Sequence, residues 1–394
     1  MLLEASVYGE YAMNKTTFIE QVRIQGFRSL ADVELLGIPK AAVLIGANGS
    51  GKSNFIRFFE MLSWMLGPRR LGKFVAIQGG ADDQLFGGRR RSPEMSATVT
   101  MRTTAIKPET MQTSLVQYDY RITLAWAQSD RLIFSEEAFR GPTAEDWQYL
   151  GSGHSEAKIV EDIPPHASLA NHRFTTQFIV SLLRSCSVYQ FHDTSDASNF
   201  KTSWDVEDNN QLLSHGGNLA AVLHRLEQED IKRYDRICQH IGRILPGFDR
   251  FVIEESNGKV LLRWKSEKTD KTFGAHLTSD GSLRFFALVT LLNLPLEMLP
   301  DVILLDEPEL GLHPAAITLI GGMIKVLARE RQVIVATQSP LLVDAFDLDE
   351  IFVLDIENGR TKFRKLAPDD YRVWLDENFT SGELWQKNLL GGRP

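Results

Sequence analysis

One glycine-rich stretch has the composition and spacing of a loop that cradles phosphate groups. It fits the pattern G-x-x-x-x-G-K-[ST] with residues Gly46, Ala47, Asn48, Gly49, Ser50, Gly51, Lys52 and Ser53. Glycines let the backbone wrap closely around a phosphate and turn successive N–H groups toward its oxygens. We expect Lys52 to bridge the β and γ phosphates of ATP, Ser53 to hold Mg²⁺, and Asn54 to line the same site. The stretch therefore predicts nucleotide binding.

A second set of candidate residues follows an apolar run over 302–305. Asp306 and Glu307 end this run, so both would lie at the tip of a buried strand. Asp306 is expected to hold Mg²⁺ through water, and Glu307 to polarise the water that attacks the γ phosphate. The alternative is a pair of solvated acids on a turn. Glu309 and His313 follow, but two side chains are too few for a zinc site.

A third stretch, Ser279-Asp280-Gly281-Ser282, comes shortly before that run. Taken alone, it indicates a helix cap or a turn. A helix that begins there would place a second helix N-terminus in the molecule. Such an N-terminus can bind an anion.

Strands and helices must alternate to position these residues. A short apolar run over 41–45 predicts a buried strand before the glycine-rich loop. A helix is predicted after the loop by apolar residues at helical spacing, namely Phe55, Phe58, Phe59, Leu62 and Met65. The last third repeats this alternation, with predicted helices over 284–294 and 314–329, buried strands over 302–305 and 333–336, and a hairpin at Asn358-Gly359. The pattern predicts an α/β fold with a largely parallel central sheet.

We divide the chain into five predicted parts. They are an extension over 1–14, the N-terminal part of an ATPase domain over 15–88, an inserted α+β lobe over 89–275, the C-terminal part of the ATPase domain over 276–366, and a tail over 367–394. The inserted lobe is expected to contain β-strands and then helices.

Together the three motifs resemble those of ATP-binding-cassette ATPases, which are P-loop NTPases with a mixed central sheet. In that family a signature serine and glycine at a helix N-terminus complete the γ-phosphate site of a partner subunit. Ser279 and Gly281 take these places in this sequence. One phosphate loop and one signature in the sequence therefore imply a homodimer with two composite ATP sites.

Within that family the sequence is similar to the RecF and SMC-like branch, which works on DNA. The similarity rests on Gly26-Phe27-Arg28-Ser29-Leu30, on residues 306–314 and on Ala336-Thr337-Gln338-Ser339-Pro340. The segments Gly382-Glu383-Leu384-Trp385 and Gly391-Gly392-Arg393-Pro394 resemble the ending of short stand-alone bacterial ATPases of the AAA family. Those proteins are related to the ATPase half of overcoming-lysogenization-defect (OLD) nucleases. The resemblance extends over 15–70 and 275–394, and only loosely over 89–275.

Some positions depart from the family pattern or leave alternatives open. Gln338 stands where many relatives carry a histidine near the γ phosphate. Glutamine can donate a hydrogen bond but takes up no proton at neutral pH, so slow turnover is expected. Arg28 is a candidate nucleotide contact, and a surface arginine is the equal alternative. Gln78, Gln84 and Gln190 are all candidates for the glutamine that contacts Mg²⁺.

Composition limits the remaining classes of function. The 394 residues are 43% hydrophobic and 24% charged, with a net charge of −8, which argues against a protein that is basic overall and coats DNA. The basic run Arg89-Arg90-Arg91 is either a local DNA contact or a solvated loop. No apolar run is long enough to span a membrane, and the two cysteines, Cys186 and Cys238, imply no disulfide framework. We expect a cytoplasmic protein without a membrane partner.

Two functions remain open at this stage. The first is a DNA-linked ATPase switch that dimerises on ATP and acts with a separate nuclease or other effector, in repair or anti-phage defence. The residues after Arg360 are too few for the Toprim domain of OLD nucleases, so any cleavage is expected from another protein. The second function is an ATP-sensing module with little turnover, which Gln338 favours. A transporter ATPase fits less well, because no glutamine loop is evident soon after the phosphate loop.

Overall fold

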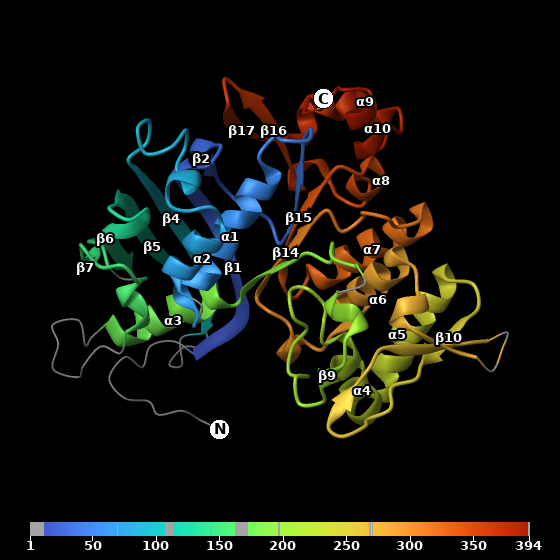
Figure 1. Cartoon of the computed structure of the whole chain (residues 1–394). Helices are drawn as coiled ribbons and strands as arrows, with labels where there is room; N and C mark the ends of the chain where they lie inside the picture. Colours follow the sequence, from blue (N-terminus) through green and yellow to red (C-terminus); the bar gives the residue numbers. More distant parts are fainter. Residues whose placement is uncertain are drawn as a thin grey trace.

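The structure is a computed structural model that describes residues 12–68, 70–106, 113–142, 144–161, 172–195, 198–267, 269 and 271–392. Two six-stranded sheets lie on either side of a layer of helices (Figure 1). The first sheet is antiparallel in the order β2-β1-β4-β5-β6-β7, and its strands are β1 (Ala12–Phe27), β2 (Leu30–Leu35), β4 (Glu94–Ile106), β5 (Thr113–Ala127), β6 (Arg131–Arg140) and β7 (Gln148–Gly151). Most of the expected 1–14 extension lies outside the described residues, and β1 already includes residues 12–14.

The second sheet is mixed and contains the candidate residues at its edge. Its order is β17-β16-β3-β15-β14-β8, with β3 (Ala41–Ile45), β8 (Cys186–Tyr189), β14 (Val302–Asp306), β15 (Gln332–Thr337), β16 (Ile351–Glu357) and β17 (Arg360–Lys365). Five strands are parallel, and only β17 pairs antiparallel, with β16. The carboxyl ends of the parallel strands therefore meet at one edge, where an α/β sheet binds its ligands. The predicted α/β class and mixed sheet are confirmed.

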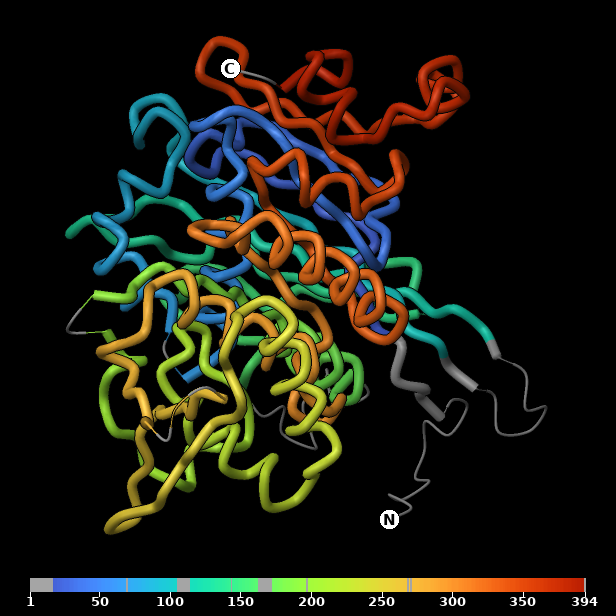
Figure 2. Tube along the Cα trace, turned by 90° about the vertical axis from the view of Figure 1, so that its right-hand side faces the viewer, coloured from blue at the N-terminus to red at the C-terminus, as the bar shows by residue number. Residues whose placement is uncertain are grey.

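Residues 89–275, expected as an inserted lobe, lie in three places. Strands β4 to β7 continue the first sheet, since β4 pairs with β1 from Ala12↔Ile106 to Gln25↔Ser96. Strand β8 forms an edge of the second sheet. The elements over 198–275 form the third part, with α4 (Leu219–Glu229), α5 (Ile231–Ile244), β9 (Trp204–Asp205), β10 (Phe248–Phe251), β11 (Lys259–Val260), β12 (Arg263–Ser266) and β13 (Thr272–Gly274) (Figure 2, green to yellow-orange). The expected boundary at 88/89 thus runs through one continuous sheet.

Helices α1 (Lys52–Leu66), α2 (Leu71–Ile77) and α3 (Arg173–Arg184) form a core with the first sheet and one face of the second. In α1 the side chains of Phe55, Phe58, Phe59 and Leu62 are buried, which confirms the predicted helical spacing. Each such side chain contributes about 1.5–3 kcal/mol on burial. The phosphate loop is therefore held between a fully buried strand and a helix most of whose apolar side chains are buried.

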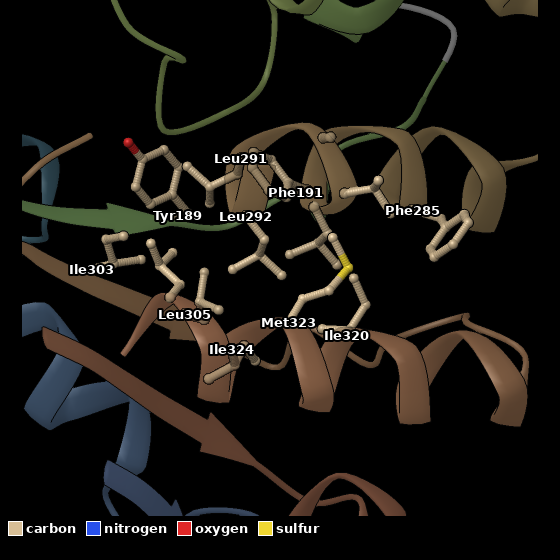
Figure 3. Close-up of a cluster of buried hydrophobic side chains, with 14 of the residues drawn as sticks. Tyr189, Phe191, Phe285, Leu291, Leu292, Ile303, Leu305, Ile320, Met323 and Ile324 are labelled. Carbon is tan, nitrogen blue, oxygen red and sulfur yellow. The ribbon is translucent and has the colours of Figure 1, made fainter. Parts of the chain in front are cut away.

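The opposite face of the second sheet is covered by α6 (Asp280–Asn293), α7 (Pro314–Leu327) and α8 (Pro340–Val343). Figure 3 shows this core, in which Ile303 and Leu305 of β14 face Leu291 of α6 and Ile324 of α7. The chain then continues to α9 (Arg372–Asp376) and to α10 (Ser381–Gln386), and α10 packs beside α8. Across the described ranges, no helix is long and apolar enough to cross a lipid bilayer.

Candidate functional site

The phosphate loop connects β3 to α1 and leaves the first turn of that helix uncapped. Gly51 is the N-cap residue with φ 104°, and no side chain caps the free N–H groups of α1. A side chain at position 51 would place its Cβ only 2.1 Å from Thr361 Oγ1, so the loop requires glycine there. Uncapped N–H groups at a helix N-terminus are suited to bind phosphate oxygens.

Lys52 lies inside this loop rather than in solvent. Its side chain is 4% exposed, and Nζ donates hydrogen bonds to the carbonyl oxygens of Gly46 at 2.6 Å and Ala47 at 3.0 Å. Burial lowers the pKa of the ammonium group, while the nearby carboxylates of Glu307 and Asp306 act in the opposite direction. The charge is therefore confined to the position where it can bind a phosphate.

Asp306 ends β14 beside the phosphate loop. Its Oδ2 accepts a hydrogen bond from Gln190 Nε2 at 2.8 Å, and the Ser53 hydroxyl lies close enough to influence its carboxyl group. Its Oδ1 is buried and has no hydrogen-bond partner. Burial raises the pKa of Asp306, and the Glu307 carboxylate acts in the same direction, whereas His192, Gln190 and Ser53 oppose the shift. A buried carboxylate oxygen without a partner is stabilised by a cation.

The oxygen atoms gathered here fit Mg²⁺. Ser53, Asp306 and Gln190 supply a hydroxyl, a carboxylate and an amide, and hard oxygen donors of this kind are what Mg²⁺ prefers when water and phosphate complete its octahedron. The described residues hold no cluster of three or more His, Cys, Asp or Glu that could bind a metal by themselves. His313 instead caps α7 by accepting a hydrogen bond from the Ala315 N–H at 3.2 Å.

Glu307 has a strained backbone that fixes its side chain at the sheet edge. Its φ is 47°, which is unfavourable for a residue with a side chain, and its N–H donates to Ala336 O at 2.8 Å. Its carboxylate accepts a hydrogen bond from the Gln338 side-chain amide. Strain of this kind costs on the order of 1–3 kcal/mol and concentrates at functional sites.

Glu309 holds Gln338 in place. One Glu309 oxygen accepts from Thr337 Oγ1 at 2.6 Å and from the Gln338 N–H at 2.8 Å. Burial raises the pKa of Glu309, while these two hydrogen bonds oppose that shift. This role of Glu309 is not evident from the sequence, because nothing in its spacing reveals that β15 ends beside it.

The structure separates the three candidate glutamines. Only Gln190 contacts Asp306. Gln78 and Gln84 instead accept hydrogen bonds from the Arg28 guanidinium, at 3.3 Å and at 2.9 and 3.1 Å. Burial lowers the pKa of Arg28. Arg28 is thus a partly buried structural contact of the first sheet, and its expected contact with nucleotide stays a prediction.

Asn54 also lies at the entrance of α1 rather than in the loop itself. Its side-chain amide donates to Ser29 Oγ at 2.8 Å, and Ser29 Oγ lies 2.7 Å from Thr361 Oγ1. These contacts join β17 and the turn after β1 to the first turn of α1. Asn54 can therefore hold the helix N-terminus in position.

Ser279 and Gly281 lie at the start of α6, where the sequence predicts a helix N-terminus. Ser279 is exposed and caps the helix, with its Oγ accepting from the Ser282 N–H at 3.3 Å. A Cβ at Gly281 would lie 2.3 Å from Gly311 O. Glycine is needed at position 281 in the single chain, because the backbone after Glu307 passes directly over it.

Arg284 of α6 connects this helix to the two segments that follow β8 and β14. Its guanidinium donates to Phe191 O at 3.0 Å, to His192 O at 2.9 Å and to Leu310 O at 3.3 Å. The segment after Gln190, the segment after Glu307 and α6 therefore share one side chain. No motif in the sequence marks Arg284 for this role, because its partners lie far from it along the chain.

A comparison with protein families decides the affiliation. The family model described as "AAA domain, putative AbiEii toxin, Type IV TA system" matches residues 41–344, most of the chain. The chain belongs to this AAA family. Its matched region includes the phosphate loop, the Asp306-Glu307 edge and Gln338.

Two curated relatives support the same branch for this AAA-family chain. It is 41% identical over 66 residues to the DNA replication and repair protein RecF of Anaeromyxobacter sp. (strain Fw109-5), covering 16% of the chain and 18% of the relative. It is 35% identical over 72 residues to RecF of Anaeromyxobacter dehalogenans (strain 2CP-C), covering 18% and 19%. The chain thus matches less than a fifth of the length of these relatives.

Solved structures show the same fold. The AAA-family chain is similar to an SmcHead bound to the C-winged helix domain of ScpA, with a TM-score of 0.57 and 15% identity over 90% of this chain and 99% of that chain. It is also similar to an Smc head domain with an extended coiled coil, bound to the C-terminal domain of ScpA derived from Pyrococcus furiosus (TM-score 0.55, 14% identity, 92% and 99% covered). The predicted resemblance to P-loop ATPases of the RecF and SMC-like branch is confirmed.

Proposed function

We propose that the protein binds ATP with Mg²⁺ and hydrolyses it at two composite sites formed by a homodimer. The observation that carries this proposal is the convergence of Lys52, Ser53, Asp306, Glu307 and Gln338 at one edge of the second sheet. The carboxylates of Glu307 and Asp306 lie close enough to Lys52 to act on its pKa, and Gln338 donates a hydrogen bond to Glu307. Phosphate binding, metal binding and water activation thus have their residues within one small region.

Each residue then has a distinct part in the reaction. The N–H groups of 46–51 and the ammonium of Lys52 bind the phosphates. Ser53, Asp306 and Gln190 hold Mg²⁺, which neutralises charge on the β and γ phosphates when bound. Glu307 orients and polarises the attacking water, and Gln338 fixes the Glu307 carboxylate.

The dimer is proposed because the signature serine is exposed and because, in the family that the sequence resembles, a signature completes the phosphate site of a partner subunit. Ser279 is exposed at the start of α6, and its hydrogen bonds stay within that helix. A second copy related by two-fold symmetry would bring Ser279 and Gly281 to the γ phosphate of the first copy. Each copy would then complete the site of the other.

The setting of the activity is proposed to be DNA-linked, with a separate effector protein. Support comes from the RecF relatives and from the family description, which names a toxin of a toxin–antitoxin system. The basic run at 89–91 adds to this, since Arg89 lies over the Trp126 ring at 4.2 Å and Arg91 over the Phe86 ring at 4.4 Å. Stacking fixes these guanidinium groups without removing their charge.

Steady-state phosphate release by the wild type, with and without duplex DNA, tests this proposal. We expect slow but measurable release that requires Mg²⁺ and rises when DNA is added. Release that is unaffected by DNA would contradict the DNA link alone. ATP binding without any phosphate release would favour the second candidate function, an ATP sensor. The hydrogen bond from Gln338 to the Glu307 carboxylate supports this alternative, because it engages the group that would activate water.

A further inference from the structure

The segment Thr380–Gly392, called here the 380–392 segment, packs against the first residue of the phosphate loop. A Cβ built on Gly392 would meet Val353 Cγ1 at 2.6 Å and the Cα of Gly46 at 3.4 Å. Gly46 is the first residue of the phosphate loop and itself lies against the Leu354 carbonyl, which its own Cβ would meet at 2.4 Å. The backbones of three segments therefore meet at the start of the loop, with no space for a side chain.

The same segment also packs against the helix that follows Gln338. In α10, a Cβ on Gly382 would lie 2.2 Å from Pro340 O, and the Gly382 N–H donates to Asp344 Oδ1 at 2.7 Å. Ser381 Oγ donates to Phe346 O at 3.2 Å. Figure 1 shows α10 beside α8, so the segment contacts both sides of the nucleotide site.

Buried side chains and one arginine hold the segment in this position. Leu384 and Leu390 are fully buried, and Trp385 is nearly so, in the core beneath α8. The Arg364 guanidinium of β17 donates a hydrogen bond to the Leu390 carbonyl oxygen. A burial of this extent defines one docked position rather than a loosely associated strand of chain.

We propose that the 380–392 segment is a structural part of the nucleotide site, and that its docking and nucleotide binding are energetically coupled. The inference rests on the proposed binding of ATP at the phosphate loop. Gly46 and Gly392 are positioning residues, because displacement of either backbone moves the N–H groups that bind phosphate. By linkage, nucleotide must then stabilise the docked segment as much as docking favours nucleotide.

A matched pair of glycines separates this coupling from simple backbone strain. Gly258 and Gly392 have φ of 72° and 70°, so alanine is about equally strained at both. A Cβ at 258, in the turn before β11 and outside the segment, meets no atom within 4 Å, whereas a Cβ at 392 collides with the Val353 side chain beside Gly46. We expect Gly392→Ala to weaken binding of a fluorescent ATP analogue with Mg²⁺ about tenfold, and Gly258→Ala to leave it within about twofold.

A second pair tests the contact with α8 if Gly392→Ala does not fold. Gly382→Ala should weaken binding, although alanine favours helices, because its Cβ would displace Pro340. Gly322→Ala in α7 is the control, since no atom lies within 4 Å of that Cβ. Hydrogen exchange over 381–392 should also slow when ATP and Mg²⁺ are added to the wild type.

The outcomes are distinguishable. A wild type that binds no analogue would overturn the proposed function, and this inference with it. A wild type that binds, together with equal affinities of Gly392→Ala and Gly258→Ala, or of Gly382→Ala and Gly322→Ala where Gly392→Ala does not fold, would overturn the coupling alone. Unfolding temperatures measured without nucleotide check that folded proteins are being compared.

Discussion

Replacing Lys52 with alanine is expected to weaken ATP binding about a hundredfold. The buried ammonium group would make charge-assisted hydrogen bonds to two phosphate groups, and each such bond is worth about 1.5–3 kcal/mol. Without the ammonium group, the negative phosphate would face the carbonyl oxygens of Gly46 and Ala47, to which Lys52 donates hydrogen bonds. Isothermal titration with ATP and Mg²⁺ measures the loss.

Lys40→Ala is the matched control for this prediction. Lys40 also donates to a backbone carbonyl, that of Arg329 at 3.1 Å, but it is solvent-accessible and lies at the opposite end of β3. Its removal should leave ATP affinity unchanged. Equal affinities of Lys52→Ala and wild type would exclude the phosphate loop as the binding site.

The Glu307→Gln variant is expected to bind ATP normally and to release phosphate about a hundredfold more slowly than the wild type, or slower still. An amide has the shape of the carboxylate, and its oxygen can still accept the Gln338 hydrogen bond. It cannot draw a proton from water, so the loss should fall on turnover and not on binding. Single-turnover phosphate release, with ATP affinity measured in parallel, separates the two.

Glu377→Gln serves as the control for that variant, since Glu377 is an exposed acid at the C-terminal end of α9. It should turn over ATP like the wild type. If Glu307→Gln also kept full turnover, another group would have to activate the water, and the proposed role of Glu307 would be wrong.

Local sequence was sufficient to predict the phosphate loop and its neighbours. The strand before Gly46 and the helix after Gly51 depend on contiguous apolar residues and on spacing within one helix. The acids at 306 and 307 were predictable for the same reason, because the buried five-residue strand β14 ends at Asp306 and Glu307 follows it. These features are encoded within a few residues of one another.

Contacts between distant segments could not be predicted in this way. Gln190 and Asp306 are 116 positions apart, and only the parallel pairing of β8 with β14 brings them together. The assignment of 89–275 as one inserted lobe depended on local pattern, which does not reveal that β4 pairs with β1 or that β8 joins the other sheet. The role of the 380–392 segment was hidden likewise, because its glycines are explained only by backbones far away in sequence.

Light scattering on the Glu307→Gln variant with ATP and Mg²⁺ tests the composite dimer most directly. Slow hydrolysis should trap the closed state, and this variant is predicted to be a dimer with ATP and a monomer without it. Adding Ser279→Arg places a bulky cation at the exposed start of α6, where it should block approach of the second copy, so the double variant should stay monomeric. Monomers in both cases, with ATP bound, would contradict a site completed by two copies.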